Sequence, residues 1–419
     1  MSAPQNAATE WRSYWYLPFV AALGYATSVI HVYTIGPFIG PLQAEFGWSR
    51  AEISLGLTVS SIISALFCIP IGMLVDKIGP RRIGLIGIVL MTAAFALLST
   101  ATGSIANWVV LWTCIAFATL GVQATVWTSA VNSRFEQSRG LALALTLSGA
   151  SLSAAIFPLF ATWLISSYGW RTGFWGMGAL WAAIVLPFLF LFFRGARDQR
   201  SKAVPVPAKV LTGLTLSEGF RTFALYKLLL AAGLFSFTAI GALVHFVPIL
   251  TGAGTPRLEA AGIAGLIGIF SLVGRLGTGF LLDRFSAQKI GAIAFMLPVI
   301  GIALLLLDAS NHLYQSIAAA TLGLTVGAEV DVIAFLAAKH FGLKNFGSLY
   351  GAMVMALSLG TSFGPLTAGA VFDQYGSYTP FLMLNVVLMT LSAITLLSLG
   401  SPPVQAAAVV VSEPSLNHG

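Results

Sequence analysis

One arginine stands inside a segment that is otherwise built to cross a lipid bilayer. Residues 260–284 are almost all apolar or small, yet Arg275 interrupts them. A guanidinium near the centre of such a helix costs at least ~2.5–3.5 kcal/mol, so it must face protein, water or a ligand. About 12 Å of helix separates it from Asp283 and Arg284, which is too far for easy snorkelling to the interface. We favour an anion-binding arginine in a cavity over a structural arginine paired with a neighbouring helix.

Two carboxylates lie in a second apolar segment. Glu329 and Asp331 fall within residues 314–338, where no basic residue precedes Lys339. Unpaired acids in hydrocarbon take up a proton or seek a cation, as they do in proton relays. Because they are two positions apart, they point about 200° from each other around a helix, so we expect one to face an aqueous path and the other a neighbouring helix. The alternatives are helix packing or a salt bridge with Arg275, which becomes a coupling device if an anion breaks it.

Four further residues are candidates for lining the same path. His31 shares a helix face with small and polar residues, and His245 follows Thr238 and Gly241 at helical spacing. Gln123 and Trp127 share a face in another apolar segment, where the indole could form an apolar wall. For both histidines the alternative is a hydrogen-bonded packing residue, and for Trp127 it is aromatic core packing.

Short charged turns predict a gate at one membrane surface. Asp76 precedes Arg81 and Arg82 in one tight turn, and Asp283 with Arg284 recurs in the second half of the chain. Charge-assisted pairing at helix ends is the obvious use of such turns. We expect these five residues to latch two tilting groups of helices.

Composition places the chain among polytopic membrane proteins. Apolar residues make up 57% of its 419 residues and charged residues only 8%, far outside the soluble range. The polar lead-in has no signal-peptide pattern, so the first span is expected to be retained. Cys68 and Cys114 lie within predicted spans and indicate neither a disulfide nor a metal site. We predict an all-α protein with twelve spans at residues 15–36, 51–75, 82–102, 107–131, 139–166, 173–194, 223–250, 259–282, 289–307, 314–338, 346–372 and 379–399.

The distribution of basic residues predicts the orientation. With the N-terminus inside, the outer loops hold only Arg50, Arg171 and Arg257 among the basic residues near the spans. This asymmetry follows the positive-inside rule and puts both termini in the cytoplasm. The net charge of +7 is therefore explained by topology, and no nucleic-acid partner is expected.

An internal repeat divides the chain. Adding 207 to positions in the first half returns the same or a similar residue many times, for example Gly72 to Gly279 and Pro158 to Pro365. We predict two parallel six-helix pseudo-repeats with a midplane site between them. The expected divisions are an N-terminal bundle at 1–194, a cytoplasmic linker at 195–222, a C-terminal bundle at 223–400 and a cytoplasmic tail at 401–419.

Enzyme and ATPase signatures are missing from the sequence. It contains no phosphate-binding GxxxxGK[ST] loop, no GxSxG elbow, no HExxH and no zinc spacing. We expect neither enzymatic activity nor a cofactor.

Several motifs resemble a known family. The repeated turns GMLVDKIGPRR and GFLLDR, the twelve spans and the central linker resemble the major facilitator superfamily. Within it, FGWSRAEIS and SLVGRLGTGFLLDR are similar to the monocarboxylate transporter and oxalate:formate antiporter branch, in a bacterial form. The resemblance implies that Arg275 holds the substrate carboxylate. The acid four residues before that arginine in proton symporters is replaced here by Ser271.

These observations lead to one functional prediction. We expect a secondary importer of small organic carboxylates in a bacterial inner membrane, coupled to protons and working as a monomer by alternating access. The alternatives are a carboxylate exchanger, an exporter of a bulkier amphipathic or aromatic compound, and a membrane sensor or assembly protein without transport.

Overall fold

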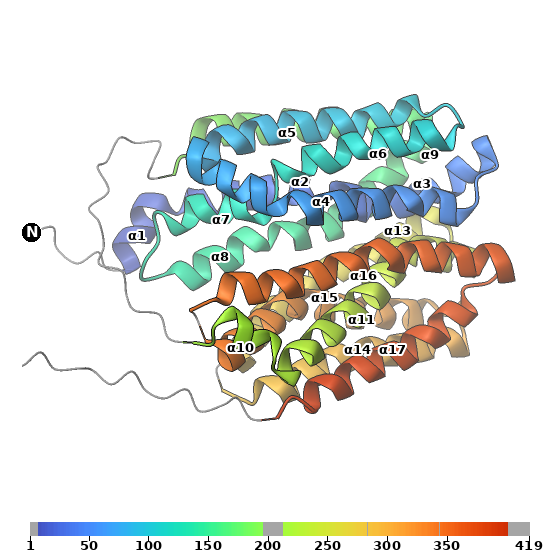
Figure 1. Cartoon of the computed structure of the whole chain (residues 1–419). Coiled ribbons are helices and arrows are strands. Elements are labelled where there is room, and N and C mark those ends of the chain that lie inside the picture. The colour runs from blue at the N-terminus through green and yellow to red at the C-terminus, as the bar shows by residue number, and fades with distance from the viewer. Residues whose placement is uncertain (1–6, 196–212, 283, 343, 401–419) are drawn as a thin grey trace, which may run out of the picture.

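The computed structural model describes residues 7–195, 213–282, 284–342 and 344–400, apart from a few side chains in the second predicted span. Within these ranges the protein is helical, with one isolated bridge between Gly213 and Gly342. Figure 1 shows two groups of helices side by side, one from each half of the chain, with α1 and α10 at one end. Helix α11 leads from α10 to α12, which packs against α3 and α13 at the opposite end. We call these the α1 end and the α12 end. The helices are α1 (Ala7–Tyr14), α2 (Tyr16–Ser28), α3 (Ile30–Phe46), α4 (Arg50–Ile78), α5 (Pro80–Leu97), α6 (Ile105–Leu120), α7 (Ala124–Asn132), α8 (Arg139–Leu147), α9 (Gly149–Phe192), α10 (Leu216–Phe220), α11 (Phe223–Val244), α12 (Phe246–Gly252), α13 (Arg257–Leu282), α14 (Ala287–Leu307), α15 (His312–Phe341), α16 (Phe346–Tyr375) and α17 (Thr379–Leu397).

Twelve membrane crossings account for the described helices. Ten helical segments are long and apolar enough to span a bilayer, and α2 with α3, bent by 41°, makes an eleventh. The segment from Arg139 to Phe192 counts as one in that total, but its 54 residues are far longer than a single crossing requires. It turns back at Gly169, where φ is +82°, and the rings of Phe157 and Trp181 consequently lie 4.9 Å apart. In a straight helix these rings would be about 36 Å apart, so the segment is two spans.

The first span is longer than predicted. We expected it to end near residue 36, but α3 continues to Phe46 with Pro37 and Pro41 inside it. Proline is tolerated within membrane helices because neighbouring helices and side chains satisfy the freed backbone groups. The extension carries the span to the α12 end, where it contributes to the interface between the halves.

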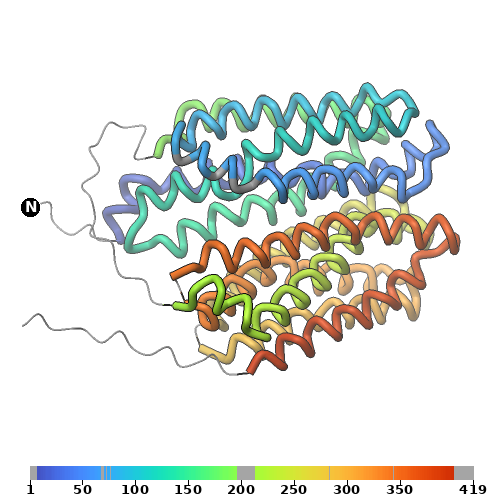
Figure 2. Tube along the Cα trace, in the orientation of Figure 1, coloured from blue at the N-terminus to red at the C-terminus, as the bar shows by residue number. Residues whose placement is uncertain are grey.

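Helix starts repeat at a constant interval between the halves. Phe223, which begins α11, follows the first residue of α2 by 207 residues, and four more pairs of helix starts have the same spacing. The reversal at Gly169 has its counterpart at Gly376, which also has a positive φ, of +67°. In Figure 2 the first half of the chain, coloured blue to green, and the second half, coloured light green to red, form separate groups of helices. The other four pairs are Arg50 and Arg257, Pro80 and Ala287, Ile105 and His312, and Arg139 and Phe346.

Helix α1 is anchored to the loop between α7 and α8. The buried carboxylate of Glu10 accepts hydrogen bonds from the amides of Glu136, Gln137 and Ser138 at 2.9, 3.0 and 3.1 Å. Burial raises the pKa of Glu10, but the three amide donors together lower it below the ordinary carboxyl value. Helix α1 therefore holds the loop between α7 and α8 in place at the α1 end.

The end of the predicted linker belongs structurally to the second half. The amide of Leu214 donates to the carbonyl of Phe341 at 2.8 Å, and the Asn345 side chain donates to the carbonyl of Leu214 at 2.9 Å. Residues 213–222, which we expected to be part of a polar connection, thus include α10 and dock onto the ends of α15 and α16.

Glycines bring α13 and α15 into backbone contact. A Cβ placed on Gly274 would collide with the carbonyl of Leu324, and one on Gly327 would collide with the carbonyl of Ser271. Small residues allow such close approach, which drives helix association in membranes. This contact fixes the distance between the arginine on α13 and the acids on α15.

Substituting Gly274 with alanine is expected to destabilise the protein by about 1–3 kcal/mol, since the added methyl forces the two backbones apart. Gly277→Ala is the matched control, because nothing lies within 4 Å of its Cβ position on the same helix. Thermal unfolding in detergent should show a lower Tm for Gly274→Ala and an unchanged or raised Tm for Gly277→Ala. Equal Tm values would contradict the backbone contact.

Candidate functional site

Arg275 is buried, and one of its donors has no partner among the described residues. Its side chain is 9% exposed, and its Nε has no hydrogen-bond partner among the described residues. The closest acid is Asp331, whose Oδ2 lies 3.6 Å from Nη1, beyond the usual hydrogen-bond range. A guanidinium carries five donors, and a buried donor left unpaired costs free energy. One further acceptor would therefore satisfy the Nε of Arg275.

The two acids of α15 differ in their surroundings. Asp331 is 30% exposed and faces Arg275, whereas Glu329 is 7% exposed and makes no hydrogen bond or ion pair with the described residues. Both interact electrostatically with Arg275. Burying a lone carboxylate in the ionised form is costly. The surroundings of Glu329 therefore favour the neutral form more strongly than those of Asp331 do.

Three tyrosines lie in electrostatic range of the charged group. Tyr25 of α2 interacts electrostatically with Arg275 and both acids, and Tyr33 of α3 interacts with Arg275 and Glu329. Tyr350 of α16 interacts with the same charges, and its ring stacks on Phe346 at 5.2 Å between centroids. Each phenol offers an apolar face and a hydroxyl that can donate or accept. Three phenols, two from the first half and one from the second, are thus in electrostatic range of Arg275.

A serine pair joins the halves one turn from Arg275. The hydroxyls of Ser151 on α9 and Ser271 on α13 lie 3.0 Å apart and are buried. A Cβ on Gly268 would collide with the backbone of α9, so the two helices touch at this level. Ser271, which stands where the resemblance leads us to expect an acid, is thus part of the contact between halves.

Three of the predicted pocket residues lie in the first half. His31 is buried, its ring meets Trp112 edge-on at 5.9 Å, and its Nδ1 has no partner among the described residues. Trp127 is fully buried and donates its indole N–H to the carbonyl of Val122 at 2.7 Å. Its ring fills the space over Gly24, so it is a core residue rather than a cavity wall. Gln123 is half-buried at the break between α6 and α7, without a side-chain cap bond.

His245 is buried in a hydrogen-bonded chain instead of lining a path. Its Nδ1 lies 2.6 Å from the Tyr378 hydroxyl, and its Nε2 lies 2.9 Å from the carbonyl of Pro365 and 3.3 Å from the Ser54 hydroxyl. Since the carbonyl can only accept, Nε2 carries the proton and Nδ1 accepts from Tyr378. The tyrosine oxygen in turn accepts from Arg50 Nη1 at 2.6 Å. The chain runs from α4 of the first half to α16 of the second.

Asp373 completes this contact at the α12 end. Its carboxylate accepts from the amides of Arg50 and Ala51, both at 2.9 Å, at the start of α4. A negative charge at a helix N-terminus is stabilising. The Arg50 guanidinium also lies 3.4 Å above the centre of the Phe372 ring. We call the set Arg50, Asp373, Tyr378 and His245 the outer latch.

Tyr378→Phe is expected to weaken the outer latch, because it leaves His245 Nδ1 and one Arg50 donor without a partner. Each buried unpaired group costs about 1–3 kcal/mol, enough to shift the balance between closed and open forms at least about fivefold. Spin labels at Thr102 and Gln374, both exposed at this end, should report a larger population at long distances. Tyr375→Phe is the control, since Tyr375 is 61% exposed. Identical distance distributions for the two variants would contradict the latch.

The predicted gate at the α1 end falls partly outside the described residues. The side chain of Asp76 and the whole of Asp283 are not described. Arg81 donates to the carbonyl of Phe190 at 2.6 Å, within the first half. Arg82 and Arg284 are both exposed. The guanidinium of Arg284 lies 3.8 Å from the centre of the Phe280 ring. Their role in gating remains a prediction.

Sequence reasoning missed the tyrosines and the acidic part of the outer latch. Tyr25 and Tyr33 are aromatic residues in an apolar span, where core packing is the more common use. The available signal was the hydroxyl, which has to find a partner inside a membrane. Asp373 carried a clearer signal, because it is an acid near the end of a predicted span and thus needs a cation or amide donors.

Two groups of helices related by an internal repeat, with a buried arginine in one of them, are the architecture of membrane transporters built from parallel repeats. The chain belongs to the Major Facilitator Superfamily, whose sequence profile matches residues 21–365. The predicted fold class is thereby confirmed, as is the resemblance to this family.

Three known proteins illustrate the similarity. The chain is 26% identical to monocarboxylate transporter 13 of Rattus norvegicus over 350 residues, 83% of this chain and 79% of that protein. It is 24% identical to a gallate transporter of Pseudomonas putida over 375 residues, 77% and 81% of the respective chains. The structure of a bacterial homolog to the human lysosomal transporter Spinster, inward-facing and unoccupied, matches with a TM-score of 0.69 over 94% of this chain and 99% of that one. At 19% identity, this last likeness concerns the fold alone.

Proposed function

We propose that this transporter carries small organic carboxylates, with Arg275 binding the carboxylate group. The observation that supports this most is a guanidinium only 9% exposed whose Nε is unpaired and whose one acidic neighbour is 3.6 Å away. A carboxylate can accept two parallel N–H bonds from an arginine, a geometry that lysine cannot offer. The names of two relatives, a monocarboxylate transporter and a gallate transporter, agree with an anion of this class.

The tyrosines favour a carboxylate with an apolar or aromatic body. Tyr25, Tyr33 and Tyr350 offer ring faces and hydroxyls around the arginine from both halves. Aromatic rings contribute stacking energy as well as buried area. We keep Gln123 as a further polar contact and drop Trp127 and His245, whose hydrogen bonds are satisfied within the protein.

Proton coupling follows from competition for Arg275. Asp331 is the acid that faces Arg275, with Oδ2 3.6 Å from Nη1. A bound carboxylate takes over the guanidinium, so Asp331 loses its countercharge and a proton becomes the cheapest way to neutralise it. Substrate and proton would thus enter together, one on Arg275 and one on Asp331. Glu329 stays neutral throughout this cycle.

Alternating access supplies the movement. The hydrogen bonds of the outer latch and of the serine pair hold the halves together at the α12 end and near the midplane. We propose that this is the form open toward the α1 end, that the α1 end is cytoplasmic, and that import requires the outer latch to part. Only three basic residues lie in the loops at the α12 end, whereas many lie in the segments at the α1 end, and this asymmetry supports the orientation.

Transport by purified protein in vesicles tests the proposal. Vesicles without internal substrate should accumulate a labelled monocarboxylate when the outside is acidified, with short-chain, hydroxylated and aromatic acids compared. Accumulation only when the vesicles already hold a carboxylate would favour exchange, which the neutral Ser271 permits. Uptake of none of the acids in either format would contradict the proposed substrate class.

A further inference from the structure

A cavity lies between the halves at the α12 end. Its volume is about 410 Å³, and it is lined by α3, α9 and the start of α4 in the first half and by α12 and the start of α13 in the second. Small-molecule sites commonly measure about 300–1,000 Å³. Its walls combine prolines, such as Pro37 and Pro248, with the hydroxyls of Thr162 and Thr251. The cavity has room and surface for a small amphipathic molecule.

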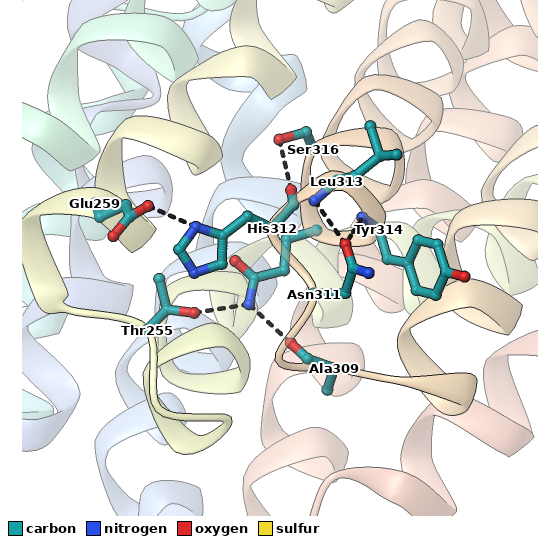
Figure 3. A network of polar contacts seen from close by, with 9 residues as sticks. Thr255, Glu259, Ala309, Asn311, His312, Leu313, Tyr314 and Ser316 are labelled. Carbon is teal, nitrogen blue, oxygen red and sulfur yellow. Dashed lines mark hydrogen bonds and ion pairs between the residues drawn. The ribbon is translucent and has the colours of Figure 1, made fainter.

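Two arginines related by the repeat line this cavity. Arg50 begins α4, and Arg257 begins α13 at the same place in the second half. Arg257 is exposed and makes no hydrogen bond or ion pair with the described residues. Its acidic neighbour Glu259 is turned away toward His312, with Oε1 2.7 Å from Nδ1, as Figure 3 shows. The charge of Arg257 is therefore available to a ligand.

The turn before Arg257 is anchored by hydrogen bonds to the start of α15. Thr255, at the edge of the cavity, accepts a hydrogen bond from the Gln315 side chain at 2.7 Å, and Gln315 also donates to the carbonyl of Ala309 at 2.7 Å. The Thr255 contact and the ion pair of Glu259 are both seen in Figure 3. The turn that carries Arg257 is thus fixed to the start of α15.

The repeat shows which group is missing from the cavity. In one half of the interface Asp373 meets the amides at the start of α4. The residue 207 positions earlier is Ser166, which lines the cavity together with Arg257 and carries no charge. A carboxylate supplied by a ligand can occupy the place that Asp373 takes on the other side.

A smaller hollow adjoins this cavity. A second hollow of about 10 Å³ shares Gly36, Pro37 and Val247 with the cavity and is lined by Tyr33. Tyr33 interacts electrostatically with Arg275. The close approach of Gly36 to the carbonyl of Val244 keeps this hollow small. A hollow of this size cannot admit a carboxylate, so it gives a ligand in the cavity no passage past Tyr33 while the halves are in contact here.

We propose that this cavity is a second anion site, in which a carboxylate with an apolar body binds to Arg257 before it passes to, or after it leaves, Arg275. Its role as a stage of transport rests on the proposed function. Binding itself does not, because it depends on Arg257 rather than on the central arginine.

Equilibrium binding of labelled benzoate to the full-length protein in nanodiscs tests the proposal. The variants are Arg257→Gln, Arg275→Lys, the double variant, and Arg171→Gln, an exposed arginine paired with Glu45 at 2.9 Å at the same end. We expect Arg275→Lys to lose the tighter benzoate site of the wild type and to retain the weaker one. In the double variant, the affinity of this weaker site for benzoate should fall at least about fivefold. Arg171→Gln should bind like the wild type, and neutral benzyl alcohol should not compete.

Two results would overturn the second site. One is equal benzoate binding by Arg275→Lys and by the double variant, and the other is competition by benzyl alcohol as strong as that by unlabelled benzoate. A failure of the proposed function has a different signature, because wild type and Arg275→Lys would then bind equally while the effect of Arg257→Gln remained.

Discussion

Arg275→Lys should lower kcat/KM for carboxylate uptake at least about thirtyfold, equivalent to about 2 kcal/mol. Lysine keeps the positive charge but replaces the planar fork of donors with a compact ammonium, so the bidentate bond is lost. Initial rates of uptake into vesicles, measured over a range of substrate concentrations, give the effect directly.

The matched control is Arg171→Lys, which makes the same chemical change at a residue 48% exposed. Exposed ion pairs contribute little, so its uptake should stay within about twofold of the wild type. Both variants should keep the Tm of the wild type without substrate within a few degrees, since neither removes a hydrogen bond that the fold relies on. Near-normal uptake by Arg275→Lys would end the assignment of Arg275 as the carboxylate site.

Asp331→Asn should uncouple transport from protons while leaving carboxylate exchange in place. Asparagine cannot gain or lose a proton, and it no longer competes for Arg275. Accumulation driven by external acid should therefore fall at least about tenfold, whereas exchange of internal for external carboxylate continues. The pH dependence of uptake should flatten in this variant, because the group that titrates on binding is gone.

Glu329→Gln is the comparison that separates the two acids. If Glu329 stays neutral through the cycle, an amide of the same shape reproduces it, and accumulation should remain within about twofold of the wild type. Its 7% exposure and lack of partners among the described residues motivate this expectation. Loss of coupling in Glu329→Gln with normal coupling in Asp331→Asn would reverse the roles of the two acids.

Much of the fold could be predicted because a bilayer imposes simple rules on the chain. Each span must satisfy its own backbone hydrogen bonds and remain apolar for about 20 residues, so spans appear as separate runs in the sequence. The repeat was visible for the same reason, since helix starts at Arg50 and Arg257 carry similar local signals. Span limits were less well predicted where proline continues a helix, as in α3.

Side-chain partners could not be predicted in the same way. His245 and Trp127 have the spacing of path-lining residues, yet both are buried. His245 is hydrogen-bonded to Tyr378, far away in the sequence, and Trp127 to the nearby carbonyl of Val122, and helical spacing reveals neither partner. The same holds for Ser271, which looked like a missing acid and is a contact to Ser151. Which way a residue points depends on how each helix is rotated against its neighbours, and glycine contacts such as that of Gly274 determine this rotation.

The sequence by itself determined that this chain is a helical membrane protein with an internal repeat, and that Arg275 and the two acids of α15 are the charges that need an explanation. Hydrophobic length and the cost of burying charge are properties of each segment alone, so no knowledge of neighbours was required. Only the tertiary structure decided that Asp331 faces Arg275, that tyrosines of both halves come within electrostatic range of it, and that Arg50 is tied to the second half by Asp373. Such pairings arise from the close approach of segments far apart in the chain, which local patterns do not encode.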